Sequence, residues 1–267
     1  MKKFKIGFIG AGNIATAIFN GIVNSGYITS DSVCVYDTLE SKMSGFVQKG
    51  AAAETSADNV VSVSEFVFLT VKPQIYPQLL PNLRRFVADT CFVDVAAGIS
   101  INYVKELLGA DVPVVRVMPN TPLMFGMGAS ALVKAKPVTD EQFDFVQGCF
   151  NSCGVTAVVD EKFINTVTAI SGSSPAFIMR FIKDMQSFAE NSGMSHDDAR
   201  KLILQSVKGS AVMIEQSSDD VDRLIRNVTS PNGTTEAGLK ALDETDFDGS
   251  LLKCLSATVT RAEELSK

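Results

Sequence analysis

The amino-acid sequence predicts an α/β domain built on a mostly parallel sheet, followed by an all-α domain. Up to about residue 160, short apolar runs alternate with segments of helical spacing, which is typical of a parallel sheet covered on both faces. From about residue 161 the strand pattern disappears and longer helical patterns replace it. We therefore expect one domain at residues 1–160 and a second at residues 161–267.

Short runs rich in β-branched and aromatic residues are expected to form the strands of the sheet, because each is followed by turn residues. Residues 13–26 and 38–50, between the first runs, have helical spacing and end on glycine. The expected strands are residues 4–9, 33–36, 66–71, 91–96 and 114–118, with edge strands at 129–135 and 155–159.

The second half of the chain contains helices with very wide apolar faces. In residues 175–193, Phe177, Phe181, Met185 and Phe188 share one face, and similar patterns follow in residues 199–216 and 250–265. A helix with such a broad apolar arc must be covered on more than one side. We therefore expect these helices to form a homodimer, and the sequence leaves open whether dimers assemble further.

The composition and charge of the chain exclude several partners and sites. Its 267 residues have a net charge of −6 and no run of lysines or arginines, so we expect no nucleic-acid or membrane partner. The first apolar run breaks into glycines too soon for a signal peptide. Five scattered cysteines argue against a disulfide framework, and no second pair or histidine joins Cys149 and Cys153 in a zinc site. A cytoplasmic protein without a metal is expected.

The single histidine of the chain restricts the chemistry. His196 follows Ser195, a predicted N-cap, and precedes two aspartates that suit the first turn of a helix. This pattern is typical of a solvated residue. We therefore do not expect an enzyme that depends on histidine as its acid or base.

The stretch "GFIGAGNIATA" joins the first predicted strand to the first predicted helix. Gly10, Gly12 and Ala15 follow the order G-x-G-x-x-A, which permits a tight turn, close approach of a pyrophosphate and close helix packing. Free N–H groups at the helix start, where Asn13 and Ile14 lie, favour phosphates. This context predicts a dinucleotide site in a Rossmann-type domain.

Asp37 ends the second predicted strand and bears on the choice of cofactor. A carboxylate there accepts hydrogen bonds from the adenosine ribose hydroxyls and repels a 2′-phosphate. Lys42 is close in sequence on the following predicted helix, and the sequence does not fix whether its ammonium group reaches the cofactor. Asp37 therefore favours NADH, while NADPH stays open.

Three polar stretches follow other strands at their carboxyl ends, where open parallel sheets bind ligands. They are "TVKPQ" (70–74), "AAGIS" (96–100) and "VMPNTP" (117–122), and prolines make the first and the third of them rigid. Rigid, polar loops suit the binding of a nicotinamide riboside. The alternative is that these stretches are loops of fixed shape without a ligand. The candidate cofactor contacts are Val71, Lys72, Pro73, Ala97, Gly98 and Asn120.

Residues 230–238, "SPNGTTEAG", have no large side chain although helical patterns lie on both sides. Backbone N–H groups of Gly233, Thr234 and Thr235 lie ahead of a predicted helix, where they would attract an anion. Because no cationic side chain lies in the motif, the backbone would be the group that holds it. The alternative is that Thr234 or Thr235 only caps the helix. Helix capping and anion binding are compatible, because one of the two adjacent threonines can cap the helix while the other contacts the ligand.

These motifs together resemble the pyrroline-5-carboxylate reductases. "FIGAGNIA", "VKP", "AAG", "VMPNTP", "SGSSPAF" and "TSPNGTTEAGL" occur in the order and spacing of that family, nearly end to end. The resemblance implies a Rossmann domain, an all-α dimerisation domain, and reduction of the cyclic imine 1-pyrroline-5-carboxylate to proline with NADH or NADPH.

The resemblance also implies roles for individual residues. Thr235 would hydrogen-bond the ring nitrogen as the catalytic residue, Thr168 would face the reaction space, and Ala97 and Gly98 would lie near the nicotinamide carboxamide. Lys72, Asn120 and Thr121 would lie beside the nicotinamide ribose. The substrate would be held by Ser230, Gly233, Thr234 and Thr235.

Some positions depart from the family pattern. Asn232 stands where a glycine is usual, Ala169 and Ser174 replace frequent glycines, and "SSDDVDRLIRN" lacks common His-Pro and Arg-Asp pairs. An imine reductase for a related ring and a non-enzymatic nucleotide sensor therefore stay open. A β-hydroxyacid dehydrogenase needs a lysine as its acid–base on the first long helix of the second domain. This alternative is disfavoured, because the corresponding residues 164–178 contain no lysine.

Overall fold

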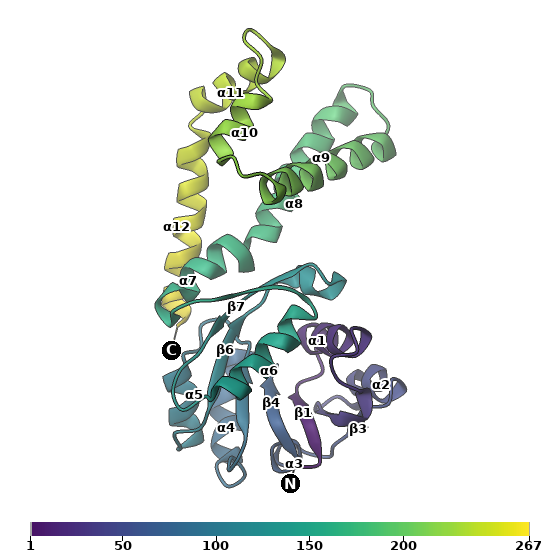
Figure 1. Cartoon of the computed structure of the whole chain (residues 1–267), viewed down its shortest axis with the longest axis vertical. Helices are drawn as coiled ribbons and strands as arrows, with labels where there is room; N and C mark the ends of the chain where they lie inside the picture. Colours follow the sequence, from purple (N-terminus) through teal and green to yellow (C-terminus); the bar gives the residue numbers. More distant parts are fainter. Residues whose placement is uncertain (1, 267) are drawn as a thin grey trace. The chain divides into compact units, whose positions relative to one another are not determined.

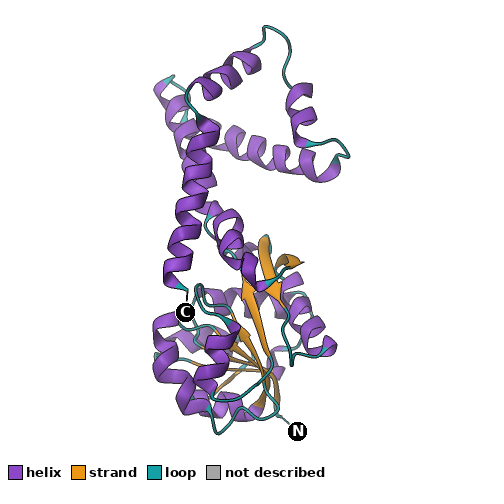
Figure 2. Ribbon diagram, turned by 90° about the vertical axis from the view of Figure 1, so that its left-hand side faces the viewer, coloured by secondary structure: helices purple, strands orange, loops and turns teal. Residues whose placement is uncertain are grey.

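The computed structural model describes residues 2–266, which form two compact units. Unit 1 extends to Pro175 and includes the chain again from Thr258, and unit 2 is Ala176–Ala257 (Figures 1 and 2). The domain boundary expected near residue 160 stays a prediction.

An eight-stranded sheet forms the centre of unit 1. Its strands are β1 (Phe4–Ile9), β2 (Val33–Tyr36), β3 (Ala52–Ala53), β4 (Ser64–Leu69), β5 (Cys91–Asp94), β6 (Val114–Met118), β7 (Gly128–Val133) and β8 (Gly154–Val158). They lie in the order β3-β2-β1-β4-β5-β6-β7-β8, and only β6 and β7 pair antiparallel. The mostly parallel Rossmann-type sheet predicted from the sequence is confirmed. Since β1 lies between β2 and β4, the strand order reverses there, and such a point is where α/β sheets bind ligands.

Helices cover both faces of this sheet and bury two apolar cores. On one face the core includes residues of α1, α2 and α6, and on the other face residues of α3, α4 and α5. Phe8 and Phe68 are fully buried, and each such side chain stabilises the fold by about 1.5–3 kcal/mol. The helices are α1 (Asn13–Asn24), α2 (Glu40–Gln48), α3 (Ala57–Val63), α4 (Tyr76–Leu83), α5 (Ile101–Leu108), α6 (Asp140–Asn151) and α7 (Ile164–Val167).

The observed strands differ from the expected ones in three ways. β4 ends at Leu69 and β5 at Asp94, each two residues before its predicted end, and β4 also begins two residues early, at Ser64. β7 and β8 each begin one residue before the predicted start, and they end two residues and one residue early. In β5 the reason is visible, because Ala96 donates its N–H to the Asp94 side chain and the chain turns away. β7 was expected at an edge but lies between β6 and β8. The two-residue β3 was not predicted.

Unit 2 is entirely helical, as the sequence predicts. Ser195 accepts a hydrogen bond from Asp198 N at 3.2 Å, which confirms the predicted N-cap of α9. Among the described helices, none combines the length and apolar character that crossing a membrane requires. The helices are α8 (Ser174–Asn191), α9 (His196–Gln216), α10 (Val221–Asn227), α11 (Thr234–Glu244) and α12 (Phe247–Leu265), and α8 begins and α12 ends in unit 1.

Candidate active site

The glycine turn after β1 leaves space at the start of α1. Gly10 has φ +101°, and a Cβ there would lie 2.9 Å from the Thr70 backbone, so only glycine fits. A Cβ on Gly12 would meet nothing within 4 Å. Gly12 is the N-cap of α1, and no side chain caps that helix start within the described chain. Open space and uncapped N–H groups, including those of Asn13 and Ile14, fit the pyrophosphate of a dinucleotide.

Asp37 lies directly after β2 and braces this turn. One of its carboxylate oxygens accepts a hydrogen bond from Ala11 N and the other from Leu39 N, each at 2.9 Å. Lys42 Nζ lies 3.7 Å from the same carboxylate. A carboxylate has about four lone-pair sites, so Asp37 can also accept from ribose hydroxyls.

The hollow beside Asp37 is acidic. Glu40 and Glu54 line it together with Asp37. Three carboxylates around one hollow repel a doubly charged phosphate more strongly than neutral hydroxyls. The hollow is therefore a candidate position for the adenosine ribose of the cofactor.

Two loops at the carboxyl ends of β4 and β5 come next along this edge of the sheet. Lys72 is exposed and precedes the short helix η2 (Pro73–Ile75), while Val71 lies against Gly10. In the second loop Ala97 is exposed, and Gly98 has φ +75°. A Cβ on Gly98 would lie 2.8 Å from the Leu265 carbonyl oxygen, so the end of α12 lies against this loop.

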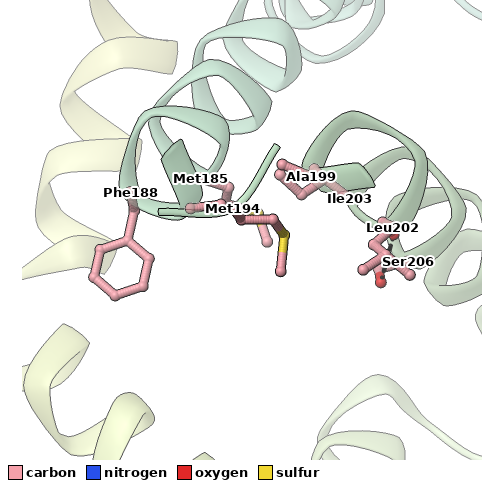
Figure 3. Close-up of a pocket in the computed structure, with 8 residues that line it drawn as sticks. Met185, Phe188, Met194, Ala199, Leu202, Ile203 and Ser206 are labelled. Carbon is pink, nitrogen blue, oxygen red and sulfur yellow. Dashed lines mark hydrogen bonds between the residues drawn. The ribbon is translucent and has the colours of Figure 1, made fainter. Parts of the chain in front are cut away.

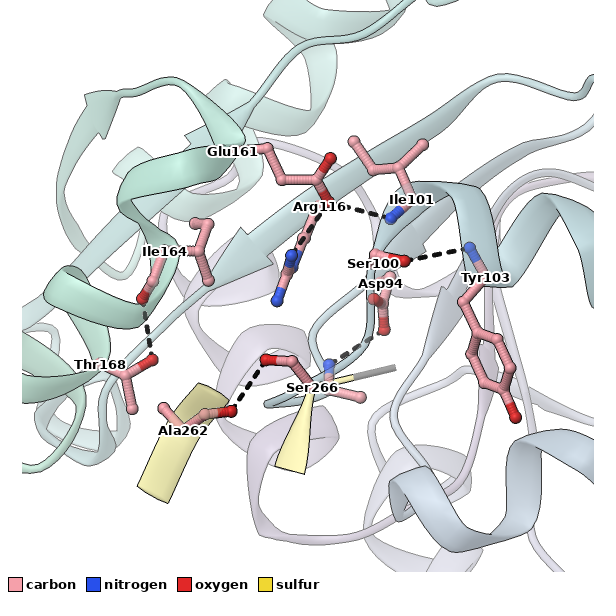
Figure 4. A network of polar contacts seen from close by, with 11 residues as sticks. Asp94, Ser100, Ile101, Tyr103, Arg116, Glu161, Ile164, Thr168, Ala262 and Ser266 are labelled. Carbon is pink, nitrogen blue, oxygen red and sulfur yellow. Dashed lines mark hydrogen bonds and ion pairs between the residues drawn. The ribbon is translucent and has the colours of Figure 1, made fainter. Parts of the chain in front are cut away.

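Asn120 and Thr168 lie beyond β6 and make hydrogen bonds within unit 1. Asn120 Oδ1 accepts from Ala129 N at 2.9 Å, and its Nδ2 donates to Ser171 O at 3.3 Å. The amide thus joins β7 to η5 (Thr168–Gly172), a π-helical turn. The Thr168 hydroxyl donates to Ile164 O at 2.9 Å (Figure 4), and its oxygen can still accept a bond.

The turn at residues 230–235 lies in unit 2 and holds the start of α11. Gly233 is the N-cap without a side-chain hydrogen bond, and Thr234 and Thr235 are the first two helical residues. The alternative that one of these threonines caps the helix is therefore wrong. Asn232 has φ +56° and donates its N–H to Glu236 at 2.7 Å, while Gly233 N donates to Ser230 O. Among the described residues, no hydrogen bond engages the N–H groups of Thr234 and Thr235, so they are free to hold an anion.

The structure gathers only part of the predicted site. All candidate cofactor residues lie in unit 1, on the loops and helix starts that follow β1, β2, β4, β5 and β6, and Thr168 is in the same unit. Ser230, Gly233, Thr234 and Thr235 belong to unit 2. The roles of individual residues stay predictions.

Sequence reasoning missed a buried charged network beside the cofactor edge (Figure 4). Arg116 Nη1 lies 2.9 Å from Glu161 Oε1, and the same oxygen accepts from Ile101 N at 3.0 Å. Burial raises the pKa of the Asp94 carboxyl to about 6. The available signal was a charged residue inside each of two apolar strands, "CFVD" and "VVRVM".

Other catalytic chemistry finds no support in the described residues. Burial raises the pKa of the thiols of Cys34, Cys91, Cys149 and Cys153, which keeps them protonated and poorly nucleophilic. His196 is exposed and lies 2.8 Å from Glu190. Within residues 2–266, no group of three or more His, Cys, Asp or Glu residues has a metal-binding arrangement.

The fold and the glycine turn define a class, the dinucleotide-dependent oxidoreductases with a helical second part. Two family models agree with this. The model described as NADP oxidoreductase, coenzyme F420-dependent, matches residues 5–98, and the pyrroline-5-carboxylate reductase dimerisation model matches residues 161–265.

Whole-chain relatives identify the family. The chain is 33% identical over 265 residues to the pyrroline-5-carboxylate reductase of Escherichia coli K12, covering 98% of each chain. The structure resembles the enzyme of that name from Coxiella burnetii (TM-score 0.92, 31% identity) and the NADP-bound pyrroline carboxylate reductase of Plasmodium falciparum (TM-score 0.90, 28% identity), each covering 100% of both chains. The chain belongs to the pyrroline-5-carboxylate reductase family and is an NAD(P)-dependent oxidoreductase.

Proposed function

We propose that this chain reduces 1-pyrroline-5-carboxylate to L-proline, the last step of proline biosynthesis. The uncapped start of α11 carries the proposal. Gly233 has no side chain at the helix start, and the N–H groups of Thr234 and Thr235 offer donors without a bulky cation. These features suit a compact substrate with one carboxylate.

The chemistry requires positioning more than proton transfer by the protein. Bound NADH or NADPH supplies the hydride that reduces the imine carbon. A protonated imine is already electrophilic, so the chain need only hold the reacting atoms within about 3–3.5 Å. The α11 N–H groups hold the carboxylate, and the Thr235 hydroxyl hydrogen-bonds the ring nitrogen. Lys72, Pro73, Ala97 and Gly98 hold the nicotinamide end of the cofactor.

NAD(P)H oxidation with racemic 1-pyrroline-5-carboxylate tests the reaction, followed at 340 nm with each cofactor. We expect turnover that depends on the substrate and forms proline. Faster turnover with the six-membered piperideine carboxylate would assign the chain to a related imine reductase. Binding of NADH without activity in either direction would instead indicate a nucleotide sensor.

Thr235→Ala is expected to lower kcat/KM by about tenfold or more, the scale of one lost transition-state hydrogen bond. Thr235→Ser should keep most of the activity, because it keeps the hydroxyl. Thr245→Ala is a matched control, since Thr245 is the C-cap at the other end of α11 and bonds Ala241 O. Unchanged steady-state kinetics in Thr235→Ala would remove Thr235 from the mechanism.

Asp37→Ser is expected to shift the ratio of kcat/KM for NADH over NADPH toward NADPH, because it removes a carboxylate from the adenosine hollow. Glu40→Gln should shift the ratio in the same direction by less, since Glu40 lines that hollow without bracing the glycine turn. A ratio that stays fixed in both variants would show that the hollow does not contact the ribose.

We infer that residues 161–267 form the dimerisation domain of a homodimer. Among the described residues of unit 2, only Ala199 and Ile203 are buried. Phe188 is 76% exposed and Leu202 59% exposed beside an apolar hollow on α8 and α9 (Figure 3). A unit with so little buried surface needs another chain to cover its apolar side chains.

Sedimentation at micromolar concentration is expected to show a dimer, or an assembly of dimers. Phe188→Glu should shift it toward the monomer, whereas Glu65→Gln, on the surface of unit 1, should not. A wild-type monomer under these conditions would contradict the proposed homodimer.

We place the protein in the cytoplasm. Cys34, Cys91, Cys149 and Cys153 are buried as thiols rather than joined in disulfides, which fits a reducing compartment. We propose no nucleic-acid or membrane partner, in keeping with the net charge of −6.

A further inference from the structure

Asp94 is a buried acidic side chain for which the proposed mechanism has no use. It is the last residue of β5, in the middle of the sheet, and is 0% exposed. Buried carboxyl groups are costly unless hydrogen bonds compensate them. The partners of Asp94 therefore indicate why the fold tolerates it.

Two hydrogen bonds meet at one oxygen of this carboxyl group. The Tyr76 hydroxyl donates to Asp94 Oδ1 at 2.7 Å, and Ala96 N donates to the same oxygen at 3.0 Å. Asp94 Oδ2 has no hydrogen-bond partner among the described residues. The arrangement therefore depends on Oδ1 alone.

The two donors adjoin different loops. Tyr76 is the first residue of α4 and directly follows η2, so it fixes the end of the loop with Lys72 and Pro73. Ala96 opens the loop that contains Ala97 and Gly98. Both loops are the ones proposed to hold the nicotinamide end of the cofactor.

We propose that Asp94 is a positioning residue that joins these two loops through Tyr76 and Ala96, and so sets how tightly the nicotinamide end of the cofactor is held. The inference rests on the proposed function, which assigns the two loops to the nicotinamide end of the cofactor. Asp94 itself is buried beneath the loops and acts through them.

The charges around Asp94 give this role a pH dependence. Tyr76 on α4, Arg116 on β6 and Glu161 ahead of α7 are the titratable or charged groups that act on it. Burial raises its pKa from 3.8 to about 6, against the opposing effects of Tyr76, Ala96 and Arg116. Above this pH the ionised carboxylate accepts the stronger hydrogen bonds, so affinity for NADH should fall as the pH drops through about 6.

Stability should change in the opposite direction. Because the folded-state pKa is raised, protonation of Asp94 favours the folded state, fully below pH 3.8, and this contribution is lost as the pH rises through about 6. Acidification toward pH 5 should therefore strengthen this part of the fold while weakening cofactor binding. If Asp94 had only a structural role, its protonation would change the stability of the fold without weakening the binding of NADH.

The test measures dissociation constants for NADH by fluorescence and for ADP-ribose, which lacks nicotinamide, by calorimetry. Tyr76→Phe removes one donor and should raise the Kd for NADH about fivefold to tenfold at pH 7.5, the scale of one lost hydrogen bond to a charged group. Asp94→Asn keeps an oxygen that accepts both bonds but removes its charge, so it should raise the Kd in the same direction by less. The Kd for ADP-ribose should stay unchanged. Tyr103→Phe is the matched control, because the Tyr103 hydroxyl on α5 has no hydrogen bond among the described residues.

The pH dependence gives a second readout. Between pH 5 and 8 the Kd for NADH of the wild type should rise on acidification, and that of Asp94→Asn should stay flat. Thermal melts over the same range should show a shallower pH dependence of Tm in Asp94→Asn, and they establish that each variant is folded.

The outcomes separate the inference from the proposed function. Wild-type protein that fails to bind NADH would contradict the proposed function. Wild-type binding with an unchanged Kd in folded Asp94→Asn and Tyr76→Phe would overturn the inference alone. An equal loss of ADP-ribose and NADH affinity would also overturn it, since the two loops would then have no particular link to the nicotinamide end.

Discussion

Gly12→Val is expected to weaken binding of NADH by about a hundredfold or more while the protein stays folded, a loss on the scale of the phosphate contacts. The backbone of Gly12 is extended, at φ −78° and ψ −175°, a conformation that valine adopts readily. A Cβ there meets nothing in the protein. The added side chain would instead occupy the space in front of the α1 N–H groups, where the pyrophosphate would lie.

Gly10→Ala provides the contrast for this prediction. Its φ of +101° and the Thr70 backbone 2.9 Å from the new Cβ make the substitution strained, at about 1–3 kcal/mol. Thermal melts should therefore show a loss of stability in Gly10→Ala that Gly12→Val does not share. If Gly12→Val bound NADH with wild-type affinity in a fluorescence titration, the turn would not be the phosphate site.

Glu161→Ala is expected to lower the free energy of unfolding by about 2–3 kcal/mol. Removing one partner of a buried ion pair costs about 3–5 kcal/mol, and the value here is lower because the Glu161 side chain is 35% exposed. The substitution leaves the Arg116 guanidinium buried without its carboxylate. It also removes the acceptor of Ile101 N at the start of α5.

Urea denaturation measures this effect, with Glu65→Ala as the control. Glu65 pairs with Lys5 at 2.6 Å, but both side chains are about half exposed, and such pairs contribute about 0–1 kcal/mol. Equal losses in the two variants would mean that burial of Arg116 does not set the cost. A larger loss in Glu161→Ala would assign the stabilisation to the network of Figure 4.

Much of the fold follows from the period of apolar residues along the chain. β1, β2 and β6 begin and end at the predicted residues, because their β-branched and aromatic runs stop sharply at turn residues. β3 has only Ala52 and Ala53 in the sheet, and two alanines give no strand signal. The position of β7 inside the sheet depends on its pairing with β8, which periodicity within one segment does not report.

The candidate site was predictable where a motif and a strand end coincide. Gly10 and Asp37 lie at one turn because each directly follows a strand, and Gly12 ends that turn at the start of α1. Asp94 was not found, because its role depends on a hydroxyl eighteen residues away in sequence. The amide of Asn120 is engaged by Ala129 and Ser171, so its predicted cofactor contact competes with a structural role that only three-dimensional contacts show.

The π-helical turn η5 makes this part of the chain sensitive to its length as well as its composition. Ser173 N donates to Thr168 O at 2.8 Å, so the turn holds one residue more than an α-helical turn. Each residue of an α-helix adds a rotation of about 100°. Deletion of Ile170 would let an ordinary turn close and would rotate every later position of α8 by that angle. Insertions and deletions here would thus turn the apolar face of α8 relative to η5, an effect that no single substitution can produce.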